Sequence, residues 1–420
     1  MTATLETPEV LAAPGTYPVP PGRGRWRVTL HRRSFVAGTS WQSTLISELP
    51  HARGRQLTQA WNKPAQFIFS LDGHDPEAAL IAELQHEITA WRWDDTTGAD
   101  VALFRGVIGQ SQDQIDDRHA VTFTAHDYAA MLSRRPTQNA YNTTNADQDN
   151  LVLNFLTMAT TFAPSLGGTL QPGAWFPLAP LNVNPDGSAR GASGQLRTRQ
   201  YPAQSDTFQM LADLAAVIGG FDFDVLPFGS TDHATDAFRV FYPQQGVTRS
   251  DTVLNFGGTV ATVQRQVSSD DYANYVRVVG KPATSGAQLF AETSNADASG
   301  VVVGTWALAD NAADVSVQAT LNDKAAADLN YYGVLLPSYT VTLRPGAWYQ
   351  GFVNMGDVVP LVVKSGRLNV TGTPVRVVGI TYNVGDDGDE NMSLVLGRPT
   401  KTLRAIFTAA QSDVDALVRR

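Results

Sequence analysis

Cysteine is absent from this 420-residue sequence. A disulfide framework, a thiol nucleophile and a cysteine zinc site are therefore excluded. Charged residues make up only 17% of the chain and hydrophobic residues 43%, which is ordinary for a packed protein. The 35 glycines and 23 prolines indicate many turns and favour a β-rich fold. The length is too great for one core and argues for about three domains.

Long apolar runs are also missing. No stretch approaches the roughly 18 apolar residues of a membrane span, and the N-terminus has no basic region followed by an apolar one. We therefore expect no stable membrane insertion and no export signal. The sequence has no large basic cluster, and its formal net charge is −9, which disfavours stable binding to nucleic acid.

Motifs of known catalytic chemistry are absent as well. The seven histidines are scattered, and there is no Gly-x-Ser-x-Gly, no P-loop and no dinucleotide-binding glycine pattern. Paired aspartates occur, but adjacent residues on a strand point to opposite faces, and acids in turns are usually solvated. We expect neither enzymatic activity nor a cofactor.

The sequence does contain one ungapped pattern twice. Residues 106–108 lead through an acidic segment into 121–123, and residues 379–381 lead in the same way into 394–396. Each copy predicts a strand, an acidic turn and a returning strand with one buried face. A duplicated β-module indicates a building block, although two unrelated acidic hairpins could share these features because Asp and Gly suit tight turns.

Periodicity and turn residues divide the chain into six expected segments. These are an extended N-terminal arm at 1–24, a first β-domain at 25–135, an inserted α+β domain at 136–250, a connecting β/α domain at 251–335, a second β-domain at 336–400 and a C-terminal helix at 401–420. The pattern of the first β-domain fits an antiparallel barrel or sandwich. Helical spacing predicts further helices within 149–164, 205–218 and 316–332, with mostly loop between the first two.

Three groups of residues are candidates for binding. Asp386, Asp387 and Asp389 gather oxygen ligands around a glycine, so they are weak candidates for a Ca²⁺ site, with a plain hairpin tip as the favoured alternative. The second group is Trp91 and Trp93, which lie on one strand face and suit a sugar-stacking platform, a core or an interface. The third group is Arg23, Arg25 and Arg27, which are either an exposed strand face or a contact with an acidic neighbour.

The segments 101–108 and 120–128 resemble the first β-domain of tail hub proteins from long-tailed bacteriophages (siphophages), usually called minor tail proteins in phages of actinobacteria. Residues 275–280, 356–359 and 377–382 are similar to later parts of the same family. The resemblance runs in order from about residue 25 to about 400. It consists of patterns of strand and turn, without a signature of fixed ligands.

The resemblance implies a mainly β fold with an α+β insertion and two tube-type antiparallel β-barrel domains, which become pseudo-sixfold in a homotrimer. It also implies a structural tail-tip hub, assembled in the host cytoplasm. The expected partners are a distal tail protein ring, the tape-measure protein and other tail-tip proteins, with DNA only passing through the lumen. A carbohydrate-binding receptor protein is the second hypothesis, and a cell-wall hydrolase is the third.

Six residues are expected to form the cores and turns of the two barrels. They are Phe104, Gly106, Phe123, Val378, Gly379 and Leu396. The arginines at 23, 25 and 27, with the two tryptophans, are the candidates for contacts between subunits.

Overall fold

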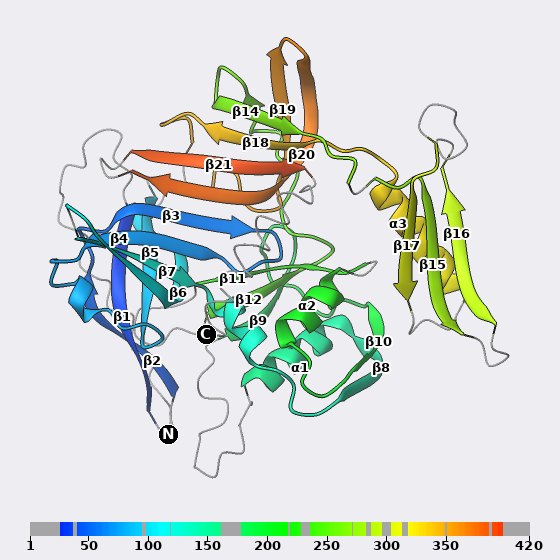
Figure 1. The fold of residues 1–420 in the computed structure, drawn as a ribbon, viewed down its shortest axis with the longest axis horizontal. Coiled ribbons are helices and arrows are strands. Elements are labelled where there is room, and N and C mark those ends of the chain that lie inside the picture. Colours follow the sequence, from blue (N-terminus) through cyan, green and yellow to red (C-terminus); the bar gives the residue numbers. More distant parts are fainter. Residues whose placement is uncertain are drawn as a thin grey trace. The chain divides into compact units, whose positions relative to one another are not determined.

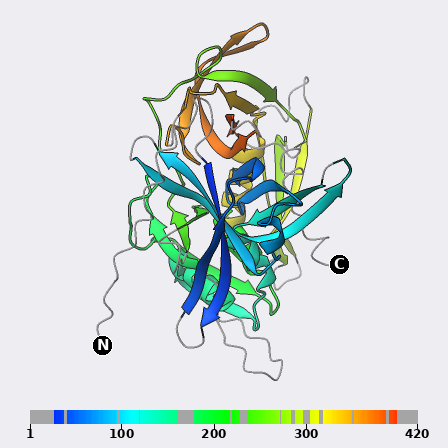
Figure 2. The same cartoon turned by 90° about the vertical axis from the view of Figure 1, so that its left-hand side faces the viewer.

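The structure is a computed structural model that describes residues 26–36, 40–94, 98–117, 119–160, 178–216, 219–227, 236–270, 272–282, 287–295, 304–312, 318–348, 351–385 and 389–397. It forms two compact units. The described residues of the first unit lie within 26–262 and 341–394, and those of the second lie within 263–340 and 395–397. The six domain ranges expected from the sequence stay predictions. Figures 1 and 2 show the described elements.

A 13-stranded sheet dominates the first unit. Its strands are β1 (Trp26–Val36), β2 (Ser40–Glu48), β3 (Arg53–Ala60), β4 (Gln66–Asp72), β5 (His86–Asp94), β6 (Ala99–Ile115), β7 (His119–His126), β13 (Leu254–Asn255), β14 (Val260–Gln266), β18 (Ser338–Leu343), β19 (Val358–Ser365), β20 (Leu368–Val384) and β21 (Glu390–Gly397). The main path runs β14-β18-β21-β20-β3-β4-β7-β6-β5-β1-β2, and β19 pairs with β13 and β20.

The repeated pattern folds into two three-stranded meanders. Strands β5, β6 and β7 pair in sequence order, with lengths of 9, 17 and 8 residues. Strands β19, β20 and β21 do the same, with lengths of 8, 17 and 8 residues. The two predicted strands are therefore confirmed in both copies, and the repeat includes one more strand than the sequence pattern indicated. Residues 386–388 of the second acidic turn lie outside the described residues.

One long-range pairing joins the two meanders in a single sheet. Strand β20 runs antiparallel to β3, from Gly379 opposite Ala60 to Val384 opposite Arg55. Strand β3 continues to β4 and β4 to β7, which completes the connection to the first meander. Figure 1 shows β20 (orange) and β3 (blue) in this sheet.

Alternating aromatic residues make the core of the first meander and its neighbours. In β4 the buried positions are Phe67, Phe69 and Leu71, with partly exposed residues between them, as period-two alternation predicts. The Phe67 ring stacks on Phe104 at 5.7 Å, and the Phe69 ring stacks on Phe123 at 5.2 Å. Aromatic side chains bury large apolar areas, so these pairs fix how β4, β6 and β7 pack.

An α+β segment follows the first meander. It contains η2 (Tyr128–Arg134), α1 (Gln148–Thr160) and α2 (Thr207–Ala215), a two-stranded sheet of β8 (Tyr141–Asp147) and β10 (Leu196–Tyr201), and a three-stranded sheet of β9 (Leu178–Val183), β12 (Asp236–Phe241) and β11 (Asp222–Leu226). Helix α2 begins after Asp206, whose side chain accepts a hydrogen bond from Gln209 N. Apolar residues of both helices and of β11 and β12 share one core, including Phe155, Leu211, Phe223 and Phe238. A further short helix, η1, spans Ala78–Leu80.

The second unit holds a three-stranded sheet with one helix. Strand β15 (Tyr275–Pro282) is central, between β16 (Gln288–Ser294) and β17 (Ala307–Ala312). Helix α3 (Gln318–Tyr332) contributes Leu321 and Ala325 to the core that it shares with Val276 and Val278.

The fold is mainly β with few helices, as expected. The helices predicted within 149–164, 205–218 and 316–332 are confirmed as α1, α2 and α3. The segment expected to be mostly loop contains β9 and β10, so that prediction is wrong for these residues. The N-terminal arm and the C-terminal helix lie outside the described residues. Within the described ranges, no helix is both long and apolar enough to span a membrane.

Candidate functional site

The junction around Asp222 is a polar site that connects the α+β segment to distant parts of the chain. Strand β11 places Asp222 so that its Oδ1 accepts a hydrogen bond from the indole N–H of Trp61, at 2.7 Å. Its Oδ2 accepts from Gln245 N at 2.7 Å and forms an ion pair with Arg376 of β20. One buried carboxylate thus ties the α+β segment to the residue after β3 and to the second meander.

Two further aspartates extend this junction. Asp224 forms a bidentate ion pair with Arg239, at 2.7 and 2.6 Å, and accepts a hydrogen bond from Gln245 Nε2 at 2.6 Å. Asp357 accepts from Val247 N and Asn354 N, both at 2.9 Å. Charge-assisted bonds of this kind are among the stronger polar contacts in proteins, so they hold the backbone around residues 245–247 in place.

A cavity of about 520 Å³ lies beside the junction. Four aspartates line it: Asp127, Asp186, Asp224 and Asp357. Each of them already accepts at least one hydrogen bond from a backbone or side-chain donor. Every aspartate in the described lining is therefore held by a hydrogen bond from another group of the chain. Hydrolysis by paired acids would need two of them in other roles, one as a proton donor and the other as a base or nucleophile.

Asp127 has the most perturbed acidity of these four residues. Burial raises the pKa of Asp127 to about 7, against the opposing effect of hydrogen bonds from Ala65, Ala129 and Ala130. A raised pKa often marks a catalytic acid. Here the carboxyl oxygens accept from Ala65 N at 2.7 Å and Ala129 N at 3.0 Å, which makes Asp127 the cap of η2.

A buried polar layer lies on the face of β5 and β6 that is opposite to the face carrying Ile88 and Phe104. Arg105 Nη1 is 3.2 Å from Asp236 Oδ1, and the two side chains are 1% and 0% exposed. In the same layer, Glu87 accepts hydrogen bonds from the hydroxyls of Ser43 and Tyr128. Buried charges are stable only when they are paired, so this layer connects the first meander to η2 and β12 in one arrangement.

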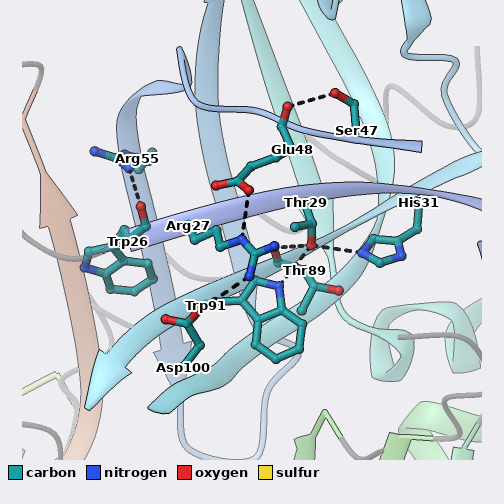
Figure 3. Close-up of polar contacts among 10 residues, drawn as sticks. All are labelled: Trp26, Arg27, Thr29, His31, Ser47, Glu48, Arg55, Thr89, Trp91 and Asp100. Carbon is teal, nitrogen blue, oxygen red and sulfur yellow. Dashed lines mark hydrogen bonds and ion pairs between the residues drawn. The ribbon is translucent and has the colours of Figure 1, made fainter. Parts of the chain in front are cut away.

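Figure 3 shows the neighbouring contacts of β1. Thr29 Oγ1 accepts a hydrogen bond from the indole N–H of Trp91 at 2.9 Å and contacts His31 Nε2 at 2.9 Å. His31 is fully buried. Burial, followed by the charges of Arg105 and Arg27, lowers the pKa of His31 to about 4. The imidazole is therefore neutral near pH 7.

The candidate interface residues within the described ranges are Arg27, Trp91 and Trp93. Arg27 forms ion pairs with Glu48 at 3.0 Å and Asp100 at 3.4 Å, so its charge is used within the chain (Figure 3). Both tryptophans are half-buried, and Trp91 uses its N–H on Thr29. Arg23, Arg25, Asp386 and Asp387 lie outside the described residues, whereas Asp389 is described, and its carbonyl accepts a hydrogen bond from Gly385 N.

The six residues expected in cores and turns are all buried: Phe104, Gly106, Phe123, Val378, Gly379 and Leu396. Both glycines lie inside strands, Gly106 opposite Ile88 in β5 and Gly379 opposite Ala60 in β3. The contribution of these residues to closed barrels stays a prediction.

The junction residues are not among those that the sequence marked as candidates. The run Phe221-Asp222-Phe223-Asp224-Val225 alternates as a strand, and this alternation was the available signal, because it places both aspartates on one face. Trp61 and Arg376, the side-chain partners of Asp222, come from distant parts of the chain, and nothing in the sequence links them to Asp222.

Solved structures share this fold over most of the chain. A tail protein from Neisseria meningitidis MC58 matches with a TM-score of 0.56 at 12% identity, covering 89% of this chain and 96% of that one. The 43 kDa tail protein of prophage MuSo2 from Shewanella oneidensis matches with a TM-score of 0.55 at 12% identity, covering 89% and 98%. A prophage tail protein from Listeria monocytogenes EGD-e matches with a TM-score of 0.50 at 11% identity, covering 92% and 99%.

These matches show the fold alone, because sequence identities of 11–12% do not indicate a shared function. The chain has the fold of three tail proteins, two of which come from prophages. Neither a scan against protein-family models nor a search of curated proteins gives a match.

Proposed function

We propose that this protein is a structural hub at the tip of a phage tail. In this proposal three chains form a ring that adapts a sixfold tail tube to threefold tip components and encloses the channel for DNA and the tape-measure protein. The likeness to three tail proteins over about nine-tenths of the chain supports the tail assignment.

The observation that carries the ring proposal is the pair of meanders. Each chain contributes β5-β6-β7 and β19-β20-β21, which have the same strand order and nearly the same strand lengths. A cyclic trimer of such chains presents six similar modules, which is the condition for matching a sixfold tube with three subunits. Closure of each module as a tube-type barrel, and contact with a distal tail protein ring, are parts of the same proposal.

A structural role also fits the chemistry of the described residues. The carboxylates at the cavity and the junction are held by donors of the chain, which fits a fixed scaffold. The net charge of −9 fits a channel that lets DNA pass without holding it. The resemblance to proteins of actinobacterial siphophages stays a prediction, since the matched structures come from other hosts.

The mass of the purified chain in solution tests self-assembly. Light scattering behind a sizing column, over a series of protein concentrations, should give three times the 45.2 kDa chain mass. A monomer mass at every concentration would contradict assembly of a ring by this chain alone.

A further inference from the structure

Three side chains that are able to bind a metal ion lie close together in loops next to β3 and β4, outside the junction. His51 lies in the turn between β2 and β3, and Asp75 and Glu77 lie in the loop between β4 and η1. One ligand atom from each of them lies within 4.8 Å of the other two. Residues from two separate loops therefore converge on one point.

The spacing of two of these ligands suits a metal ion. His51 Nδ1 and Asp75 Oδ2 are 3.0 Å apart. In the tetrahedral geometry usual for Zn²⁺, two ligands each about 2.1 Å from the ion are about 3.4 Å apart, so these two atoms need to separate only slightly to hold it. A carboxylate oxygen of Glu77, a partly buried residue, lies within 4.8 Å of both of these atoms.

The burial of the two carboxylates is a separate observation that favours binding of a cation. The side chain of Asp75 is only 6% exposed. Atom Oε2 of Glu77 is fully buried and has no hydrogen-bond partner. A buried carboxylate oxygen without a donor is unfavourable, and a cation beside it removes the cost.

We propose that His51, Asp75 and Glu77 bind one first-row divalent metal ion, for which Zn²⁺ is the probe in the experiments below. One imidazole nitrogen with two carboxylates suits Zn²⁺ and its neighbours, whereas Ca²⁺ and Mg²⁺ prefer sites made only of oxygen. His51 is 67% exposed at its side chain, so the ion can enter from solvent and keep a water molecule as a further ligand. The bound ion links the β2–β3 turn to the loop after β4.

A neighbouring pair provides a matched control. His74 Nδ1 is 3.1 Å from Asp72 Oδ1, a separation like that in the proposed site, and both side chains are exposed. Neither His74 nor Asp72 belongs to the group of three potential metal ligands found among the described residues. The substitution His74→Gln therefore removes an exposed histidine next to a carboxylate without touching the proposed ligands.

Isothermal titration of the full chain with Zn²⁺, at a pH where histidine is neutral, tests the proposal. The natural protein and His74→Gln should bind one equivalent. His51→Gln and Glu77→Gln should each bind at least about tenfold more weakly, since loss of even an outer-shell partner costs metal sites about 10–100-fold. Far-ultraviolet circular dichroism checks that each variant is folded.

Titration with Co²⁺ adds a readout of geometry. The visible absorption of bound Co²⁺ reports its ligands, and the spectrum should change in His51→Gln but not in His74→Gln. Absence of saturable Zn²⁺ binding by the natural protein would overturn the proposal. Equal losses in His51→Gln and His74→Gln would also overturn it, as would tighter binding of Ca²⁺ than of Zn²⁺.

Discussion

Gly106 occupies a position in β6 that has no room for a side chain. A Cβ built there meets the backbone carbonyl of His126 and the ring of Phe104 at less than any ordinary contact distance. Gly109, three residues further along the same strand, has nothing within 4 Å of such a Cβ. Both residues are glycines of β6, but only Gly106 is packed tightly against its neighbours.

The change Gly106→Ala should lower the free energy of unfolding by about 1–3 kcal/mol, the usual cost of forcing an extra group into a packed site. Gly109→Ala should leave it nearly unchanged. Urea unfolding followed by circular dichroism measures both. Equal effects of the two substitutions would show that packing against β7 does not decide the requirement for glycine.

His31 should make folding sensitive to acid. Its folded pKa, about 4, is below the ordinary value of 6.5, so the unfolded chain binds a proton in this interval while the folded chain does not. The contribution is present above pH 6.5 and is lost as the pH falls towards 4, at up to about 1.4 kcal/mol per pH unit.

We expect His31→Gln to lose less stability than the natural protein between pH 6.5 and 4.5, as measured by urea unfolding. His74→Gln is the control, since its imidazole is 83% exposed. Parallel pH profiles for the natural protein and His31→Gln would mean that other groups cause the acid sensitivity.

The junction at Asp222 determines how elements from distant parts of the chain are held together. Asp222→Ala removes the acceptor of Trp61 Nε1, Gln245 N and Arg376. A buried donor left without an acceptor costs about 1–3 kcal/mol, and the backbone of Gln245 is such a donor. We expect lower stability of at least this size in urea, together with faster limited proteolysis.

Asp213→Ala is the matched control for that experiment. Asp213 is exposed on α2 and accepts a hydrogen bond from Gln209 on the same helix. Its loss should change stability by less than about 0.5 kcal/mol. If Asp222→Ala were equally mild, the junction would not be a major connection between these elements.

Local patterns predicted some elements and missed others. Strands β4 and β7 and helix α2 were predictable because their buried residues recur at the period of the element. Strand β3 was missed because Leu57 is its only fully buried side chain, so its sequence shows no alternation. Strands β8 and β10 pair with each other and carry mainly polar residues, which also hides the period.

At the scale of the whole molecule, the contacts that join the two meanders are made by residues far apart in sequence. The repeat at Gly106 and Gly379 indicated two similar modules, but the pairing of β20 with β3 depends on strands about three hundred residues apart. A sequence pattern that predicts a strand does not specify which other strand becomes its neighbour. The same reason explains why the partners of Asp222 could not be predicted.

Negative-stain imaging of the purified protein at high concentration tests the central claim most directly. Class averages should show rings with threefold symmetry, six similar peripheral densities and a central opening, since each chain contributes two meanders. Particles of a single chain, or rings whose symmetry is not threefold, would contradict the proposal that this protein is a trimeric hub.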